Sequence, residues 1–320
     1  MLNITLLGSG GGMPMPNRYL SSLLMNYKGR KILIDCGEGT QVAMKIMKTG
    51  FKALDIICIT HAHGDHLFGL PGLLSTLGNS GRIEPITIIG PSGIEEIING
   101  LMVAVSGLPY EINIIENPKN YLSLDLLANS KQLRQVNEKD FSTENIMIEA
   151  LELDHSLPCL GYNFYVFRRP KFSPEKATSN QVPKKIWQKL QTGEAVNYQN
   201  KMYEPYMVLG EKRKGIKLSY ITDTRPLDTI AEFIKDSDLF ICEGTYGDNN
   251  DLHKAIKNKH MTFSEAAELA DKGKVAELLL THFSPAINEP EEYKVNAESI
   301  FKNTIIGYDG FFKSLTFEEE

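Results

Sequence analysis

The sequence lacks several features that would direct its interpretation elsewhere. No apolar run approaches the roughly 20 residues that cross a membrane. The four cysteines are scattered and form no Cys-x-x-Cys pair, which argues against a disulfide framework. No charged and apolar leader precedes the strand-like residues 4–7. We therefore expect a cytoplasmic protein with reduced, buried thiols and no membrane partner.

Positive charge is scarce overall but concentrated in one segment. The 320 residues carry a net charge of −6, and 42% of them are hydrophobic, which is typical of globular proteins. Residues 164–215 hold 11 Lys and Arg against 4 Asp and Glu, so this segment carries +7 and the remainder −13. Prolines and aromatic residues lie among its cations. We expect an inserted basic arm that binds an anion, and a single domain formed by residues 1–163 and 216–320.

The densest chemical pattern lies at residues 56–66, IICITHAHGDH. A short β-favouring run ends there, and His61, His63, Asp65 and His66 follow in close succession. Their spacing is too tight for one face of a helix, so we expect a loop at the end of a buried strand. Imidazole and carboxylate groups suit a borderline divalent ion such as zinc, and such a cluster would be costly to bury without one.

The same arrangement recurs along the chain, where short apolar runs are each followed by a metal-capable residue. These residues are Asp35, His61, His155, Asp223, Glu243 and His282. Strand-like runs alternate with helix-like segments over most of the chain, which favours an α/β sandwich. Sites in α/β sheets form beyond the carboxyl ends of the strands. The sequence therefore predicts one polar crevice to which many strands contribute.

Two capping boxes of the form Ser/Thr-x-x-Glu predict helices over residues 92–107 and 262–273. His260 lies two residues before the second cap, close to a helix N-terminus, a place that attracts phosphate. We expect it to donate a proton to a leaving oxygen, with Glu243 orienting the ring.

Several segments resemble known families. Residues 61–66, HAHGDH, resemble the His-x-His-x-Asp-His signature of the metallo-β-lactamase fold. Segments spread over most of the chain resemble ribonuclease Z, the tRNA 3′-end endonuclease. They are residues 35–41 (DCGEGTQ), 60–74, 90–91 (GP), 223–225 (DTR) and 260–262 (HMT). The basic segment falls where that family carries its tRNA-binding arm.

The resemblance implies an α/β fold, the metallo-β-lactamase αββα sandwich, with two divalent ions per subunit. Zinc is the first expectation, and manganese and iron also accept nitrogen and oxygen ligands. By the family's division, the ligands would be His61, His63 and His155 for one ion, Asp65, His66 and His282 for the other, and Asp223 as the bridge. A hydroxide between the ions would attack a phosphodiester. Asp65, His260 and Glu243 would be the catalytic residues.

The implied reaction removes the 3′ trailer from precursor tRNA, leaving a 3′-hydroxyl on the tRNA and a 5′-phosphate on the trailer. The family also implies a homodimer in which one subunit's arm holds the tRNA that the other subunit cuts. We expect RNA contacts from cations on the arm and on the loop at residues 14–19. These cations are Arg18, Arg168, Arg169, Lys171, Lys184 and Lys185.

Two segments depart from the family's pattern and keep alternatives open. The loop at residues 14–19 (PMPNRY) retains only the Pro and the Arg of the family's loop, and residues 182–187 (VPKKIW) stand where its arm has a Gly-Pro-rich tip. One alternative is a related phosphodiesterase that acts on a small phosphodiester. Another, of a different class, is a metal-stabilised RNA-binding protein without turnover.

Overall fold

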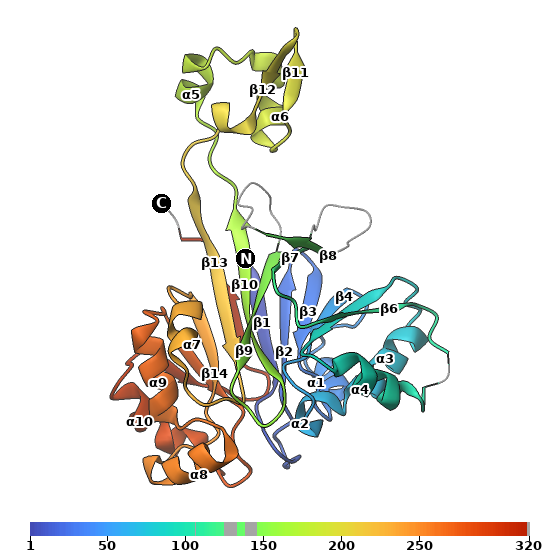
Figure 1. The fold of residues 1–320 in the computed structure, drawn as a ribbon, viewed down its shortest axis with the longest axis vertical. Coiled ribbons are helices and arrows are strands. Elements are labelled where there is room, and N and C mark those ends of the chain that lie inside the picture. Colours follow the sequence, from blue (N-terminus) through green and yellow to red (C-terminus); the bar gives the residue numbers. More distant parts are fainter. Residues whose placement is uncertain (106, 125–132, 138–145, 319–320) are drawn as a thin grey trace.

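Two β-sheets pack face to face, and helices cover the outer face of each (Figure 1). The computed structural model describes residues 1–105, 107–124, 133–137 and 146–318. In that part of the chain the first sheet has 7 strands and the second has 8. The predicted αββα sandwich is confirmed.

The strands of each sheet come from both halves of the chain. In spatial order, the first sheet contains β17 (Phe312–Leu315), β1 (Leu2–Gly8), β2 (Ser22–Tyr27), β3 (Arg30–Ile34), β4 (Leu54–Cys58), β5 (Ile86–Gly90) and β6 (Ile112–Glu116). The second contains β16 (Thr304–Ile306), β15 (Leu278–Thr281), β14 (Leu239–Glu243), β13 (Arg213–Ile221), β10 (Cys159–Arg168), β9 (Ile146–Leu153), β7 (Tyr121–Leu124) and β8 (Leu133–Val136).

The helices form two outer layers and a group at the strand ends. The layer on the first sheet contains α1 (Thr40–Ile46), α3 (Leu70–Asn79) and α4 (Ile94–Met102). The layer on the second sheet contains α7 (Asp228–Phe233), α9 (Phe263–Lys272) and α10 (Lys294–Glu298). The remaining helices of the sandwich are α2 (Gly64–Leu67), α8 (Leu252–Asn258) and two 3₁₀ helices, η3 (Asn249–Asp251) and η4 (Pro290–Tyr293).

Strand alternation builds the layers, as β1 shows. Leu2, Ile4 and Leu6 point into the core between the sheets, whereas Leu7 packs toward the helices. Each is almost fully buried, and burying one leucine side chain stabilises the fold by about 1.5–3 kcal/mol. The two sheets are therefore held together by a continuous apolar layer, and polar side chains are left to the strand ends.

Parallel pairing brings strand ends together. In the first sheet β3, β4, β5 and β6 run parallel, and in the second β13, β14, β15 and β16 do so. Their carboxyl ends therefore lie at one edge of each sheet, which is where α/β folds form their sites.

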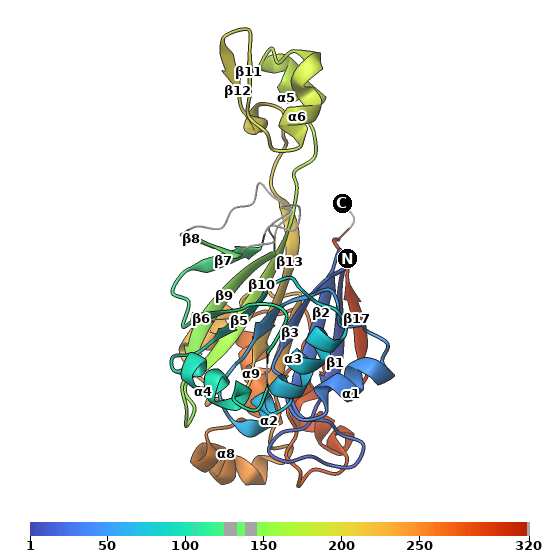
Figure 2. The ribbon, with the colours of Figure 1, turned by 90° about the vertical axis from the view of Figure 1, so that its right-hand side faces the viewer.

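The basic segment projects from the sandwich on a two-stranded ribbon (Figures 1 and 2). Strands β10 and β13 pair as far as Arg168 and Arg213, so the predicted bounds of 164–215 include the ends of this ribbon, and the part beyond it is 169–212. That part contains α5 (Pro174–Ser179), η1 (Lys184–Ile186), α6 (Trp187–Gln191), β11 (Val196–Tyr198), β12 (Lys201–Tyr203) and η2 (Pro205–Met207). It has an apolar cluster of its own, with Leu190 and Val208 fully buried.

The two predicted helices differ in outcome. Helix α9 begins after Thr262 with both hydrogen bonds of the capping box and ends at Gly273, as predicted. The prediction for α4 was wrong at both ends, because the helix spans Ile94–Met102 and Ser92 does not cap it. Gly93 precedes the helix with φ 85°, and the Glu95 N–H donates to Glu116 Oε1 at 2.8 Å instead.

Two further expectations concern thiols and membranes. All four cysteines are buried and free, which confirms the prediction for the thiols. Among the described helices, none has the length and apolar character needed to cross a membrane.

Candidate metal centre

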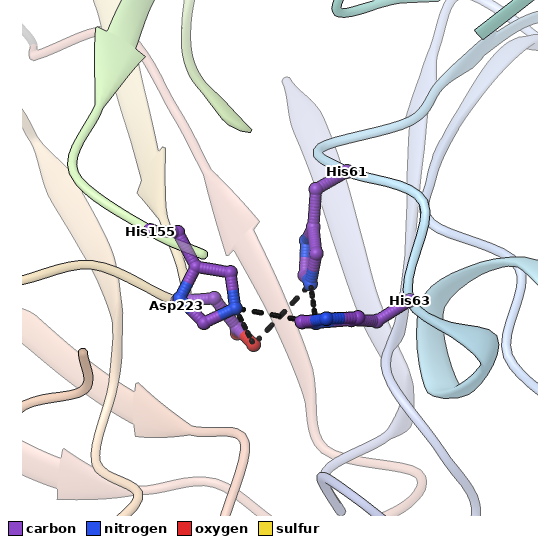
Figure 3. Close-up of side chains that lie close together, drawn as sticks. All are labelled: His61, His63, His155 and Asp223. Carbon is purple, nitrogen blue, oxygen red and sulfur yellow. Dashed lines mark hydrogen bonds and ion pairs between the residues drawn. The ribbon is translucent and has the colours of Figure 1, made fainter. Parts of the chain in front are cut away.

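Ring nitrogens and a carboxylate converge where strands of both sheets end (Figure 3). His61 and His63 follow β4, His155 follows β9, and Asp223 follows β13. His63 Nδ1 lies 2.9 Å from His61 Nε2 and 3.2 Å from His155 Nε2, and His61 Nε2 lies 3.4 Å from Asp223 Oδ2. One small volume therefore faces four potential ligand atoms.

A second group adjoins the first. His66 Nε2 lies 3.1 Å from His282 Nε2, which lies 3.3 Å from Asp65 Oδ2. Asp223 Oδ1 is 3.2 Å from the same nitrogen of His282. Asp223 thus presents one oxygen to each group, which is the arrangement that a bridging ligand requires.

The loop predicted for residues 61–66 is partly a helix. His63 ends the extended segment, and Asp65 and His66 lie in the one-turn helix α2. The His66 N–H donates to the His63 carbonyl at 3.1 Å, which closes that turn. The turn directs His63 toward the first group and Asp65 and His66 toward the second.

Partners behind the rings fix which nitrogen faces the site. His66 Nδ1 lies 2.7 Å from Asp35 Oδ2, and His155 Nδ1 lies 3.1 Å from the Lys259 carbonyl. Both partners accept hydrogen bonds, so each Nδ1 carries a proton and each Nε2 faces the site. Such outer partners commonly orient metal-bound histidines.

Two threonines contact the outer nitrogens of two other rings, those of His61 and His282. Neither threonine was predicted from the sequence. The Thr60 hydroxyl donates to Asp35 at 2.9 Å and lies 3.1 Å from His61 Nδ1. The Thr245 hydroxyl donates to Glu243 at 2.5 Å and lies 3.1 Å from His282 Nδ1. The same arrangement therefore occurs twice in the site: a buried carboxylate accepts a hydrogen bond from a threonine hydroxyl, and that hydroxyl oxygen accepts one from a histidine.

These residues fit divalent metal ions. Inward lone pairs and carboxylate oxygens at about 3 Å repel one another unless positive charge lies between them. Imidazole nitrogen and carboxylate oxygen are the donors that zinc and its neighbours accept. Asp65 Oδ2 also accepts from the Gly12 N–H at 2.6 Å, which fixes this carboxylate at the edge of the site.

The electrostatics favour the metal-binding forms of His61 and Asp223. Burial lowers the pKa of His61 well below its ordinary value, so the ring is neutral. Burial alone would raise the pKa of Asp223, but the charges of His282 and His66 outweigh it and hold that pKa well below its usual range. A neutral imidazole and an ionised carboxylate are the forms that bind metal. Burial acts to lower the pKa of His66, but the charges of Asp223 and Asp35 outweigh it and raise that pKa well above its ordinary value, so this ring must lose a proton to bind metal.

Three of the strand-end residues occupy strained backbone. Asp35, Asp223 and His282 have φ values of 58°, 40° and 59°, in the left-handed region that residues other than glycine rarely adopt. Such strain clusters at functional sites and persists because the surrounding structure enforces it. Here the left-handed residue turns the chain at the end of β3, β13 or β15, where its side chain joins the site.

His260 lines the cavity described below, and Glu243 lies buried beside it. Glu243, fully buried, accepts from the Thr224 N–H at 2.8 Å and the Met261 N–H at 3.1 Å, and its Oε2 lies 3.2 Å from His260 Nδ1. Burial acts to lower the pKa of His260, but the charge and hydrogen bond of Glu243 outweigh it and raise that pKa to about 9. His260 is therefore an imidazolium at neutral pH and can donate a proton.

The groups open into a cavity of about 650 Å³. His63, Asp65, Asp223, His260 and His282 line one part of it. This volume falls within the range of small-molecule sites.

The six cations predicted to contact RNA lie in different settings. Lys171, Lys184 and Lys185 are exposed on the arm, and Arg168 lies at its base. Arg169 lies next to Arg168 and is partly buried. Arg18 donates at 2.9 Å to the carbonyls of Ile287 and Asn288, so its guanidinium is engaged by a neighbouring loop. The RNA contacts of all six stay predictions.

Comparison with known proteins identifies the family. Ribonuclease Z of Alkaliphilus oremlandii is 61% identical over 319 residues, which cover 99% of this chain and 100% of the relative. Ribonuclease Z of Clostridium perfringens is 59% identical over 319 residues, which cover 100% of both. The chain belongs to the ribonuclease Z family. The match includes every strand end that contributes to the ribonuclease Z site described above.

Three further likenesses accompany this ribonuclease Z assignment. The family model described as "Anti-Pycsar protein Apyc1" matches residues 2–191, from the start of β1 to the end of α6. Human tRNase Z, short form, has a TM-score of 0.65 at 24% identity and covers 98% of this chain and 100% of its own. The metallo-β-lactamase fold protein YhfI of Bacillus subtilis has a TM-score of 0.66 at 18% identity, with 98% and 100% covered. These structures share the fold.

Proposed function

We propose that this protein is a metal-dependent endoribonuclease that hydrolyses a phosphodiester of precursor tRNA and removes the 3′ trailer. The observation that carries the proposal is a pair of ligand groups that share Asp223, in a chain that matches ribonuclease Z relatives over its full length. The products would be a tRNA with a 3′-hydroxyl and a trailer with a 5′-phosphate. Its buried free thiols suit a reducing cytoplasm, where we expect it to act.

We propose two metal ions per subunit, with zinc as the first expectation. The residues that would hold them are His61, His63 and His155 for one, Asp65, His66 and His282 for the other, and Asp223 for both. Seven ligands exceed the four that a single tetrahedral zinc takes. When bound, two such ions activate water near neutral pH and neutralise charge that develops on the phosphate.

Proton transfer is assigned to groups at the rim. The imidazolium of His260 would give its proton to the 3′-oxygen that leaves the scissile phosphate, because its pKa of about 9 keeps it charged. Glu243 would hold the ring in place through the 3.2 Å contact and stabilise its charge. Asp65 borders both the metal centre and the cavity, and we propose that it orients the attacking water.

We propose that the arm beyond the ribbon binds tRNA and that the protein acts as a homodimer. Cations grip an RNA backbone by charge and shape, without reading its sequence. In one subunit the arm and α2, which carries Asp65 and His66, lie at opposite ends of the molecule (Figures 1 and 2). This separation favours an arm that serves the site of a second subunit.

The proposal is tested with purified, zinc-loaded protein and a precursor tRNA that bears a 3′ trailer, beside bis-p-nitrophenyl phosphate. We expect a single cut next to the discriminator nucleotide. Asp65→Ala should abolish cleavage and leave RNA binding intact, whereas Asp271→Ala on the exposed side of α9 should change neither. Hydrolysis of the small ester alone would favour the phosphodiesterase with a small substrate, and near-normal turnover by Asp65→Ala would refute the two-metal assignment.

A further inference from the structure

Phe68 is an exposed aromatic side chain beside the metal centre. It follows α2 directly, and 63% of it is exposed. Scattered apolar residues are normal on protein surfaces. Phe68, however, lines the same cavity as His63, Asp65 and His260. An aromatic face thus stands in solvent next to the groups assigned to the reaction.

Local contacts set the position of the Phe68 ring. The Phe68 N–H donates to the Gly64 carbonyl at 2.9 Å, and the ring occupies the space that a side chain at position 64 would take. A Cβ at position 64 would lie 2.4 Å from Phe68 Cε2, so only glycine leaves this place for the ring. Gly64 lies between His63 and Asp65 in the sequence, so the position of the Phe68 ring depends on the backbone that carries these two proposed ligands.

The lining of the cavity is both apolar and charged. Pro14, Leu20, Phe68 and Pro285 are among its apolar residues, and His63, Asp65, Asp223, His260 and His282 are among its charged or metal-capable ones. The exposed carboxylate of Glu38 also lines the cavity, and it would repel a phosphate placed there but accept from a base amino group. A phosphodiester held at the proposed ligands would have its neighbouring nucleobase in the same cavity, where Phe68 offers an exposed aromatic face.

We propose that Phe68 is a stacking platform for the nucleobase adjacent to the scissile phosphate. The inference rests on the proposed function and adds a subsite to it. Proteins recognise single-stranded RNA mainly by stacking splayed bases on aromatic rings. Stacking tolerates any base, because every base has a π face. An enzyme that cuts precursors with different trailers needs such a contact, which positions the nucleotide without selecting its identity.

The test couples a change in the protein to a change in the RNA. The zinc-loaded enzyme and Phe68→Ala are compared by kcat/KM on three precursor tRNAs: one intact, one abasic on the 5′ side of the cut, and one abasic on the 3′ side. We expect Phe68→Ala to lower kcat/KM on the intact precursor by roughly 5- to 150-fold, the loss typical of one base–aromatic stack. On one of the abasic precursors the two enzymes should be equal. Phe68→Tyr should cleave the intact precursor at close to the normal rate.

Phe312→Ala provides the matched control, because Phe312 is 59% exposed and lies on β17, outside the residues that line the cavity. It should leave all three rates unchanged. An equal loss for Phe68→Ala on all three precursors, or a fall in its zinc content, would overturn the inference and assign the residue to support of the metal centre. No loss on the intact precursor would overturn it as well. If the unaltered enzyme fails to cut the intact precursor, the proposed function itself falls.

Discussion

At the scale of single residues, Thr245 has the most consequential contact that lies outside the ligands. Its hydroxyl donates to Glu243 and accepts from His282 Nδ1, so it sets the orientation of a ligand. Thr245→Val keeps the shape and removes the hydroxyl. We expect zinc affinity to fall about 10- to 100-fold, the usual effect of losing an outer partner of a metal ligand. Competition with a chromogenic chelator measures this.

Thr76→Val is the control for that substitution, because its hydroxyl donates to Gln41 at 2.6 Å on the helical side of the first sheet. It removes one hydroxyl from a threonine with a comparable hydrogen bond and should leave zinc affinity unchanged. Equal affinities in both variants and the unaltered protein would show that His282 is oriented without Thr245.

Glu243 should set the alkaline limit of cleavage. Its negative charge stabilises the imidazolium of His260, whose pKa is about 9, so the acid form is lost as the pH rises through that value. Glu243→Gln removes the charge and should lower the pKa, which moves the alkaline fall in rate to lower pH. Single-turnover cleavage of precursor tRNA across pH 6–10 measures the shift. Glu277→Gln, in a distant ion pair with Lys313, should leave the profile in place. Superimposable profiles for Glu243→Gln and the unaltered enzyme would exclude His260 as the acid.

The clustering of the proposed ligands at residues 61–66 was predictable because its signal is local. His61, His63 and His66 stand within six positions, directly after a run that must be buried. The hydrogen bonds that orient these rings were not predictable, because the sequence does not show which acceptor a threonine hydroxyl will contact in the fold. Thr60 meets Asp35 from 25 residues away, and that meeting depends on the parallel pairing of β3 with β4.

At the scale of elements, the N-terminus of α9 should contribute measurable stability. The Thr262 side chain accepts from the Glu265 N–H at 3.2 Å, and the box is closed in both directions. Thr262→Ala should lower the free energy of unfolding by about 0.5–2 kcal/mol, the range found for lost caps. Urea denaturation measures this, with Thr229→Ala on the exposed face of α7 expected within about 0.5 kcal/mol of the unaltered protein. If Thr229→Ala lowers the free energy of unfolding as much as Thr262→Ala does, the loss cannot be assigned to the N-terminal cap of α9.

Helices α4 and α9 show why one capping box was predictive and the other was not. Each is preceded by a Ser or Thr that stands three residues before a Glu, Ser92 for α4 and Thr262 for α9. At α4 the carboxylate of Glu116, on the neighbouring strand β6, takes the Glu95 N–H that a Ser92 cap would need. A competitor from another strand is invisible in the local sequence, and tertiary contact decided the helix start.

At the scale of the whole molecule, the arm lies far from the metal centre of its own subunit, so we expect it to act in binding and not in the chemical step (Figures 1 and 2). Lys184 and Lys185 are exposed in the arm, and each phosphate contact adds about one to the slope of log affinity against log salt. Replacing both lysines with Glu should weaken tRNA binding and reduce that slope by about two. Filter binding at several salt concentrations measures it. The control variant, Lys235→Glu with Lys272→Glu, makes the same charge change on the sandwich. If the control lowers the salt slope of tRNA binding as much as the arm variant does, the effect comes from net charge and not from contacts made by the arm.

The same variant separates an arm that works within its own subunit from one that serves the partner. Lys184→Glu/Lys185→Glu has an intact site and a defective arm, and Asp65→Ala has the reverse. The two proteins are mixed under conditions of subunit exchange, at a tRNA concentration too low for the arm variant alone to cleave. If arms act across a homodimer, the mixture should regain about one quarter of normal activity, because half of the randomly paired dimers are mixed and each has one working site. If each arm serves its own site, no subunit in the mixture has both parts and activity stays absent. Sedimentation of the mixture shows whether dimers form, so a monomer would refute the homodimer directly.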